Sequence, residues 1–220
     1  SATVGLEYQY PYGIALDVPQ HRAYVTHRWG DTARYVTVID TVGLGVSSYG
    51  DYPMSEITGI AVRPSASSVF VAQRYNSQNN PSLAIFDYTG GAFHKLRPWN
   101  TGLPLTLDGS TYYGKPVGVA YNPNTERVFV NSYNQNVVVV VDAINLQVLT
   151  ALGVGTNPDL GIAVNPVTSM VYVANRASGT LSVIQDGAVG PTPTPTLTPT
   201  PTPLPCAADA YEPDNTPAQA

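Results

Sequence analysis

The segment GIAVNPVTSMVYVANRASGTLSVIQ, residues 161–185, decides the fold predicted for this chain. Its apolar runs, GIAV, MVYVAN and TLSVIQ, are separated by turn residues and are typical of short β-strands. The pattern occurs four times and always starts at a glycine: Gly13, Gly59, Gly118 and Gly161. An aromatic residue stands at the same offset from each glycine: Tyr24, Phe70, Phe129 and Tyr172. Repeats of several strands each at this spacing predict the blades of an all-β propeller.

The sequence on either side of the four repeats determines how the propeller is expected to close. Residues 1–12 resemble the end of a repeat, whereas the last repeat runs into proline where its outer strand should stand. We therefore expect residues 2–8 to supply the fourth strand of the last blade and so to close a four-blade ring without exposed sheet edges. Blades missing upstream, or two chains that complete each other, are the alternatives. The predicted propeller domain is 1–188, with an insertion at 97–116.

The second predicted region, residues 189–205, has a composition that cannot build a core. Its alternating prolines, PTPTPTLTPTPTP, favour an extended polyproline II linker. Threonine and proline together are typical of O-glycosylated stalks. The candidates for this modification are Thr192, Thr194, Thr196, Thr198, Thr200 and Thr202. The single cysteine, Cys206, opens the last region, residues 206–220, and one cysteine cannot form an internal disulfide.

Composition excludes two classes of protein and favours a third. The net charge is −5, and no basic stripe is present, so we expect no nucleic-acid partner. No apolar run approaches the length of about 18 residues that a membrane-spanning helix needs. Only 11% of residues are charged while tyrosine is abundant, a balance that suits a β-rich extracellular protein.

Two stretches carry a resemblance to known families. VYVANRASGTLSVIQ and RAYVTHR…YVTVID resemble the YVTN family of β-propeller repeats, found in secreted and surface-layer proteins of archaea and bacteria. The resemblance covers about residues 1–186. It implies a propeller, a prokaryotic extracellular or cell-surface setting, and binding or structural roles. Related lactonase-type propellers are enzymes, but none of their catalytic residues matches a position of this chain.

The last residues carry a second, shorter resemblance. ADAYEPDNTPAQA, residues 208–220, resembles the opening of bacterial pre-peptidase C-terminal domains, which are small secreted β-sandwiches. In such a domain Asp209, Glu212 and Asp214 would be the residues to watch as calcium ligands. The match is too short to carry that role over.

A candidate binding rim follows from repeat symmetry, because the second strand of every repeat should end on one face of the propeller. The loops that join one blade to the next, including the insertion 97–116, should lie on the same face. Long loops on a rigid scaffold tend to be functional. Arginine and aromatic residues dominate binding hot spots. The alternative is that each arginine pairs with a neighbouring blade and the aromatic residues pack between loops. The candidate rim residues are Arg28, Trp29, Arg74, Tyr75, Trp99, Tyr112, Tyr113, Tyr133 and Arg176.

Other polar residues favour structural interpretations. Three aspartates close the third strands (Asp40, Asp87 and Asp142), where we expect each carboxylate to accept hydrogen bonds from the backbone of the following turn. The three histidines (His21, His27 and His94) occupy different repeat positions and do not converge as metal ligands or a catalytic pair would. We therefore expect no metal site and no cofactor.

The predicted function is a non-enzymatic extracellular module that binds a protein or glycan, or other copies of itself, at the cell surface. The alternative is a structural subunit of a filament or layer joined by strand or tail donation. A hydrolase or lactonase-type enzyme is a weaker third hypothesis. Catalysis in a central channel needs convergent polar groups, whereas the first strands read GIAL, GIAV, GVAY and GIAV.

Overall fold

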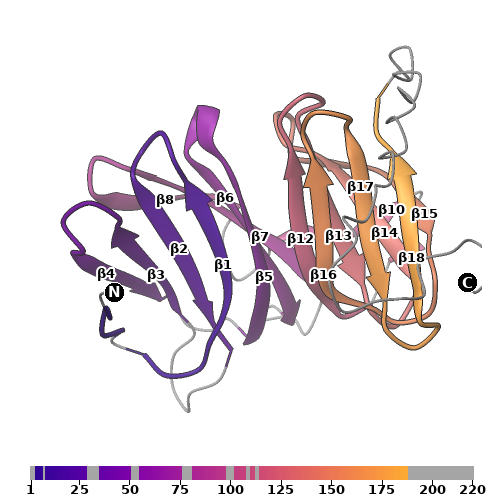
Figure 1. Ribbon diagram of the computed structural model, residues 1–220, viewed down its shortest axis with the longest axis horizontal. Helices are drawn as coiled ribbons and strands as arrows, with labels where there is room; N and C mark the ends of the chain where they lie inside the picture. Colours follow the sequence, from indigo (N-terminus) through magenta and orange to yellow (C-terminus); the bar gives the residue numbers. More distant parts are fainter. Residues whose placement is uncertain are drawn as a thin grey trace, which may run out of the picture. The chain divides into compact units, whose positions relative to one another are not determined.

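The computed structural model describes residues 3–6, 8–28, 35–50, 55–75, 81–97, 102–107, 110–111 and 114–187, and the described residues form antiparallel sheets (Figure 1). Ser1–Gly187 form one compact unit. The second unit, Ala188–Ala220, lies outside the described residues, and with it the predicted linker, its threonines and Cys206.

Four sheets follow the four repeats. Blade 1 contains β1 (Pro11–Asp17), β2 (Arg22–His27), β3 (Tyr35–Asp40) and β4 (Val46–Gly50). Blade 2 contains β5 (Ser55–Arg63), β6 (Ser68–Tyr75), β7 (Ser82–Thr89) and β8 (Ala92–Arg97), with the short β9 (Leu103–Pro104) beside β7 and the 3-10 turn η1 (Pro64–Ala66). Blade 3 contains β12 (Pro116–Asn122), β13 (Arg127–Ser132), β14 (Val137–Asp142) and β15 (Gln147–Gly153). Blade 4 contains β16 (Pro158–Asn165), β17 (Met170–Asn175) and β18 (Thr180–Gln185).

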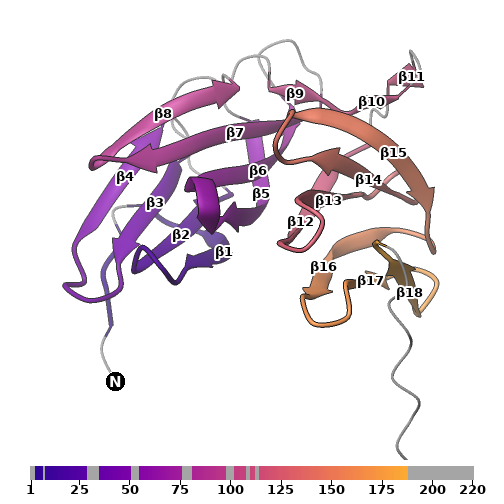
Figure 2. The ribbon, with the colours of Figure 1, turned by 90° about the horizontal axis from the view of Figure 1, so that it is seen from above.

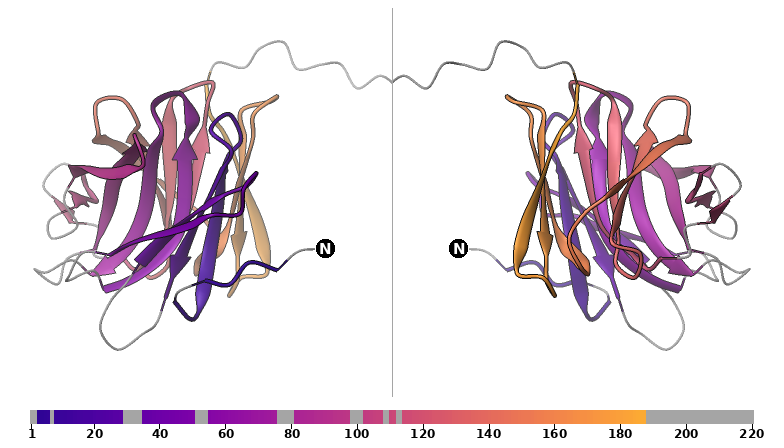
Figure 3. Two further views of the ribbon diagram at one scale, coloured as in Figure 1. Left: turned by 90° about the vertical axis from the view of Figure 1, so that its left-hand side faces the viewer. Right: turned by 90° about the vertical axis from the view of Figure 1, so that its right-hand side faces the viewer.

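The blades succeed one another around a common axis as a four-blade β-propeller, which confirms the predicted fold. The first strand of each blade lies on the inside and the last on the outside (Figure 2). Within each blade the strands are connected in sequence order and are twisted (Figure 3), as L-amino acids require of β-strands. A small hairpin of β10 (Thr106–Leu107) and β11 (Ser110–Thr111) lies in the predicted insertion.

The turns within the blades repeat as closely as the strands. In every blade the residue directly before the second strand has a positive φ near 50°: His21, Ser67, Glu126 and Ser169. Asp40 and Asp142 accept hydrogen bonds from backbone N–H groups of the following turn at 2.7–3.1 Å. Asp87 instead accepts from the hydroxyl of Thr89 at 3.2 Å. The structural interpretation of these aspartates is confirmed for the first two.

Three apolar clusters join the four blades in pairs. Each blade has a forward face, which carries the repeat glycine and the repeat aromatic residue, and a backward face. At the first junction Tyr24 and Val38 of the forward face of blade 1 pack against the backward face of blade 2. The same arrangement joins blade 2 to blade 3 around Phe70 and blade 3 to blade 4 around Phe129. Burial of these side chains is the main source of stability for the unit.

The repeat glycine lets neighbouring blades approach closely. A Cβ atom added to Gly59 would lie 2.2 Å from the carbonyl oxygen of Val117 in the next blade. Gly13 and Gly118 meet the carbonyls of Thr58 and Leu160, each at 2.7 Å. Every contacted carbonyl belongs to the residue just before the next repeat glycine, so the first strands pack in one constant register.

The predicted closure by an N-terminal strand is wrong. Among the described residues, blade 4 has three strands, and residues 3–6 are not in a strand. The N-terminal segment lies against blade 1 instead: Val4 and Leu6 share a hollow with Val25 of β2, and the ring of Tyr8 packs edge-on against His27 at 5.9 Å. Contacts with blade 1 thus hold the N-terminal segment in place.

Candidate binding face

The second strands β2, β6, β13 and β17 end on a common side of the propeller, because the first strands pack in one register and each second strand is antiparallel to its first. We call this side the second-strand face. It holds four of the predicted rim residues at equivalent repeat positions: Arg28, Arg74, Tyr133 and Arg176. Trp29, Trp99, Tyr112 and Tyr113, and the side chain of Tyr75, lie outside the described residues.

The arginines of the second-strand face are bonded within their own blades. Arg74 forms an ion pair with Glu56 at 2.8 Å. Arg176, whose side chain is 72% exposed, lies 3.6 Å from Asp159. Both carboxylates precede the repeat glycine of the same blade. These arginines therefore do not hold neighbouring blades together through the described residues.

Arg28 makes the most elaborate contact of this face. Its guanidinium donates to the hydroxyl of Tyr12 at 2.8 Å and lies 4.6 Å from the centre of the same ring. The Nε atom of Arg28 is buried and has no hydrogen-bond partner among the described residues. Tyr10, Pro11, Tyr12 and Arg28 line an adjoining pocket of about 320 Å³. An arginine and two tyrosines around one hollow provide both stacking surfaces and hydrogen-bond donors.

A row of buried polar side chains lies one residue before the rim position. Its members occupy equivalent positions in the four blades: His27, Gln73, Ser132 and Asn175. Asn175 donates to the hydroxyls of Thr180 and Ser182, at 3.1 and 2.9 Å. Gln73 Nε2, Ser132 Oγ and Asn175 Oδ1 have no partner among the described groups. This row was not identified from the sequence. The signal for it was the polar residue that directly precedes each rim position, because successive side chains of a strand point to opposite faces.

His27 is the titratable member of the row. Its Nε2 lies 2.8 Å from the hydroxyl of Thr37 and its Nδ1 lies 3.1 Å from the carbonyl oxygen of Gln9. Burial lowers the pKa of His27 below its ordinary value of 6.5, although hydrogen bonds to the backbone of Gln9 and Tyr8 act in the opposite direction. Burial favours the neutral imidazole because the charged form loses hydration.

The opposite face carries arginines of a different kind. At the side where first strands end and second strands begin, Arg63 of blade 2 bonds Glu126 of blade 3 at 2.6 Å. Arg127 of blade 3 bonds Asp186, which follows the last strand of blade 4, also at 2.6 Å. We call this side the first-turn face. The alternative for the rim arginines was that they pair with neighbouring blades. Such pairing is made by Arg63 and Arg127 on the first-turn face.

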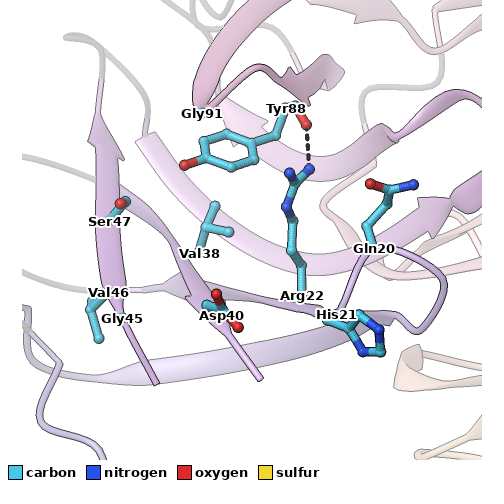
Figure 4. A pocket seen from close by; sticks show the side chains of 10 residues that line it. All are labelled: Gln20, His21, Arg22, Val38, Asp40, Gly45, Val46, Ser47, Tyr88 and Gly91. Carbon is cyan, nitrogen blue, oxygen red and sulfur yellow. Dashed lines mark hydrogen bonds between the residues drawn. The ribbon is translucent and has the colours of Figure 1, made fainter. Parts of the chain in front are cut away.

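The seam between blades 1 and 2 on the first-turn face contains a pocket of about 360 Å³ that the sequence did not reveal (Figure 4). Arg22 crosses this seam, donates to the carbonyl oxygen of Tyr88 at 2.6 Å and lies 4.7 Å from the centre of its ring. Asp40 also lines the pocket, and backbone N–H groups of Val42 and Gly43 lower the pKa of its carboxyl. Because Arg22 already joins the two blades, the seam has a structural role.

Two features are absent from the described residues. These residues contain no group of three or more histidine, cysteine, aspartate or glutamate side chains placed to hold a metal ion. They also contain no long apolar helix of the kind that crosses a bilayer.

Comparisons with known proteins identify the fold. No protein-family model matches the chain, and no curated protein sequence matches it. Among solved structures, the chain is similar to hydrazine synthase of Kuenenia stuttgartiensis, with a TM-score of 0.61, 16% identity, and coverage of 80% of this chain and 58% of that one. It is also similar to a functionally unknown protein from Desulfotomaculum acetoxidans, with a TM-score of 0.60, 17% identity, and coverage of 82% and 56%.

The nidogen/laminin complex is a further structural match, with a TM-score of 0.55, 14% identity, and coverage of 82% of this chain and 66% of that one. This chain spans somewhat more than half the length of the first two structures. At such low identities the similarity concerns the fold, and the chain is a β-propeller whose activity has to be argued from its own residues.

Proposed function

We propose that this chain is a non-enzymatic extracellular β-propeller module that binds a protein or glycan partner through its second-strand face. One contrast carries the proposal. The arginines of the first-turn face join neighbouring blades, whereas Arg28, Arg74 and Arg176 bond only within their own blades among the described residues. Arg28, Arg74 and Arg176 are therefore not needed for the junctions between blades, and their side chains can serve in recognition of a partner.

The pocket beside Arg28 defines the chemistry of the partner. Tyr10, Pro11 and Tyr12 offer flat apolar surfaces, and the guanidinium of Arg28, which also lines the hollow, adds hydrogen-bond donors. Guanidinium groups bind carboxylates through paired hydrogen bonds, and tyrosine rings stack on sugar or peptide planes. We propose an acidic glycan or an acidic peptide segment as the occupant, with Arg176 as a second, exposed contact.

The setting of the module is proposed from the sequence. The YVTN-like repeats and the threonine–proline stretch support a prokaryotic secreted or cell-surface protein on an O-glycosylated stalk. A non-enzymatic role is supported by the first strands, whose small apolar residues offer no catalytic groups to a central channel. Intact-mass and peptide mass spectrometry of protein from the native host would show whether Thr192 to Thr202 carry sugars.

A binding experiment with a matched structural control tests the proposal. Acidic and neutral oligosaccharides and acidic and neutral peptides are immobilised, and binding of the whole chain is measured by biolayer interferometry. We expect Arg28→Met with Arg176→Met to reduce binding to the acidic probes about tenfold or more, because two charge-assisted contacts are lost. The melting temperature should fall only slightly, because the lost contacts lie within single blades and no junction between blades is broken.

Arg22→Met is the matched control on the first-turn face. It removes the bond to Tyr88 between blades 1 and 2, so it should lower the melting temperature and leave binding unchanged. Equal binding by wild type and by the Arg28 and Arg176 variant would refute the role of the second-strand face. Failure of all acidic probes to bind would refute the proposed ligand chemistry.

A further inference from the structure

The two end blades of the unit each expose an apolar face whose equivalent is buried in the other blades. On the forward side, one position of the third strand is fully buried in blades 1 to 3, where it is occupied by Val36, Leu83 and Val138. Its equivalent in blade 4, Leu181, is 60% exposed. The third-strand position two residues later is buried in blades 1 to 3 as Val38, Ile85 and Val140. Its equivalent in blade 4, Val183, is 54% exposed. Blade 4 thus presents an uncovered forward face.

Blade 1 shows the reverse arrangement. The residue after the repeat glycine is buried as Ile60 in blade 2 and as Val119 in blade 3, because the preceding blade covers it. In blade 1 the equivalent Ile14 is 66% exposed, and Leu16 two residues later is 58% exposed. The uncovered face of blade 1 is therefore its backward face.

These two uncovered faces are the complementary halves of one more blade–blade junction. Every junction in the structure joins a forward face to a backward face, and among the described residues the buried apolar clusters join only successive blades. The forward face of blade 4 and the backward face of blade 1 remain apart. Large exposed apolar patches on a folded domain mark interaction sites.

Gly161 shows that the forward face of blade 4 retains the shape of a junction. At the three buried junctions the repeat glycine faces a carbonyl of the next blade, and a side chain there would collide with it. An added Cβ at Gly161 would meet only Ala174 of its own blade, at 2.8 Å. By the common register, its missing partner is the carbonyl that precedes a repeat glycine. Blade 1 offers that carbonyl at Tyr12.

The shapes of the two faces also match. On blade 1, a hollow of about 350 Å³ is lined by Val4, Leu6, Ile14, Val25 and Ile39 together with Pro11, Tyr12 and Gly13. On blade 4, Leu181 and Val183 project from β18. The buried junctions are likewise formed by apolar side chains of one blade packed against apolar side chains of the next.

We propose that copies of this chain associate head to tail, with the forward face of blade 4 packed against the backward face of blade 1 of a second copy. Gly161 then lies against the Tyr12 carbonyl of that copy, and Leu181 and Val183 fill its hollow. Two copies that make this contact reciprocally form a ring of eight blades, within the range known for propellers. If the angle does not close, the same heterologous contact extends into a filament. The hollow shares Pro11 and Tyr12 with the pocket beside Arg28, but the contact is argued from the exposed apolar faces and does not rest on the proposed binding function.

Three variants of the whole chain test the contact. The forward variant is Leu181→Glu with Val183→Glu, and the backward variant is Ile14→Glu with Leu16→Glu. The control is Val167→Glu, which adds the same charge at a turn residue that is 90% exposed and lies outside both faces. Since all these residues are exposed, each variant should fold, which circular dichroism checks. Mass in solution is measured by sedimentation equilibrium over a range of concentrations.

We expect wild type and control to reach at least twice the chain mass of 23.4 kDa, and each face variant alone to remain monomeric. An equimolar mixture of the forward and backward variants should then form a dimer, because each variant retains the face that the other lacks. This rescue also shows that both variants are folded.

Several outcomes would overturn the proposal. One is a wild type that is monomeric at all concentrations; if the face variants then also melt lower, the two faces close within one chain. Association that survives in either single variant would mean that a different surface, or a face paired with itself, carries the contact. Monomers in the mixture would exclude head-to-tail pairing.

Discussion

Substitution of Gly59 by alanine tests how closely the propeller depends on the approach of its first strands. The added methyl group would lie 2.2 Å from the Val117 carbonyl oxygen and 2.8 Å from the Val119 nitrogen. Ordinary contacts begin near 3.4 Å, so β5 and β12 must separate by about 1 Å. Backbone atoms cannot rotate away as a side chain would. A gap of this size removes roughly a quarter to a half of the dispersion energy of the facing atoms.

We expect Gly59→Ala to lower the free energy of unfolding by about 3 kcal/mol, the upper end of the range for overpacking a core. For a unit of this size that corresponds to a fall of roughly 6–12 °C in melting temperature. Gly153→Ala is the matched control, because nothing lies within 4 Å of its added Cβ. It should be neutral or stabilise by up to about 1 kcal/mol, since alanine restricts the unfolded chain. Urea titrations followed by circular dichroism would refute the reasoning if the two variants agreed within about 1 kcal/mol.

Three further predictions concern buried polar groups. Asp186→Ala should cost about 2–3 kcal/mol in urea unfolding, because the buried carboxylate and its charge-assisted bonds are lost, although the 41% exposed Arg127 can regain water. Thr58→Val should cost about 1–2 kcal/mol, because the buried hydroxyl bond to a blade 3 carbonyl at 3.1 Å is lost at nearly constant volume. The lowered pKa of His27 means that the unfolded chain binds more protons below pH 6.5, so stability should fall as pH decreases through that value. His27→Gln, which introduces the residue that blade 2 has as Gln73, should flatten this dependence.

Each of these predictions has a contrary result. An Asp186→Ala variant as stable as wild type would mean that the carboxylate is replaceable by water. A Thr58→Val variant with unchanged stability would show that the blade 3 carbonyl has another partner. A pH profile of unfolding that is the same with and without His27 would assign the acid sensitivity to another group.

The repeat pattern was enough to predict blades, their strands and their turns. The run Val137–Val141 is short, wholly β-branched and flanked by turn residues, a pattern that predicts a buried strand, and β14 has four of these valines buried. Asp40 and Asp142 were placed correctly in their turns, because an aspartate after a strand acts through its nearest backbone neighbours. Interactions of this kind are local, and local interactions leave a direct trace in the sequence.

Contacts between blades could not be predicted in the same way. The sequence grouped Arg28, Arg74 and Arg176 with the aromatic rim but did not distinguish them from Arg63 and Arg127, which join neighbouring blades. That distinction depends on which end of a blade faces its neighbour, and therefore on three-dimensional register. The closure by residues 2–8 failed for the same reason: strand-like composition was visible, but the choice between blade 1 and blade 4 depends on packing.

The bonds around Asp186 have a mechanical consequence. Asp186 immediately follows β18, an edge strand whose ladder to β17 could be unzipped one pair at a time. Its carboxylate is bonded by Asn122, Thr125 and Arg127, all of blade 3. A pull on the chain beyond Gly187 therefore loads blade 3 before it reaches β18. The Asp186 side chain therefore transfers part of such a load to blade 3 and reduces the load on the ladder between β17 and β18.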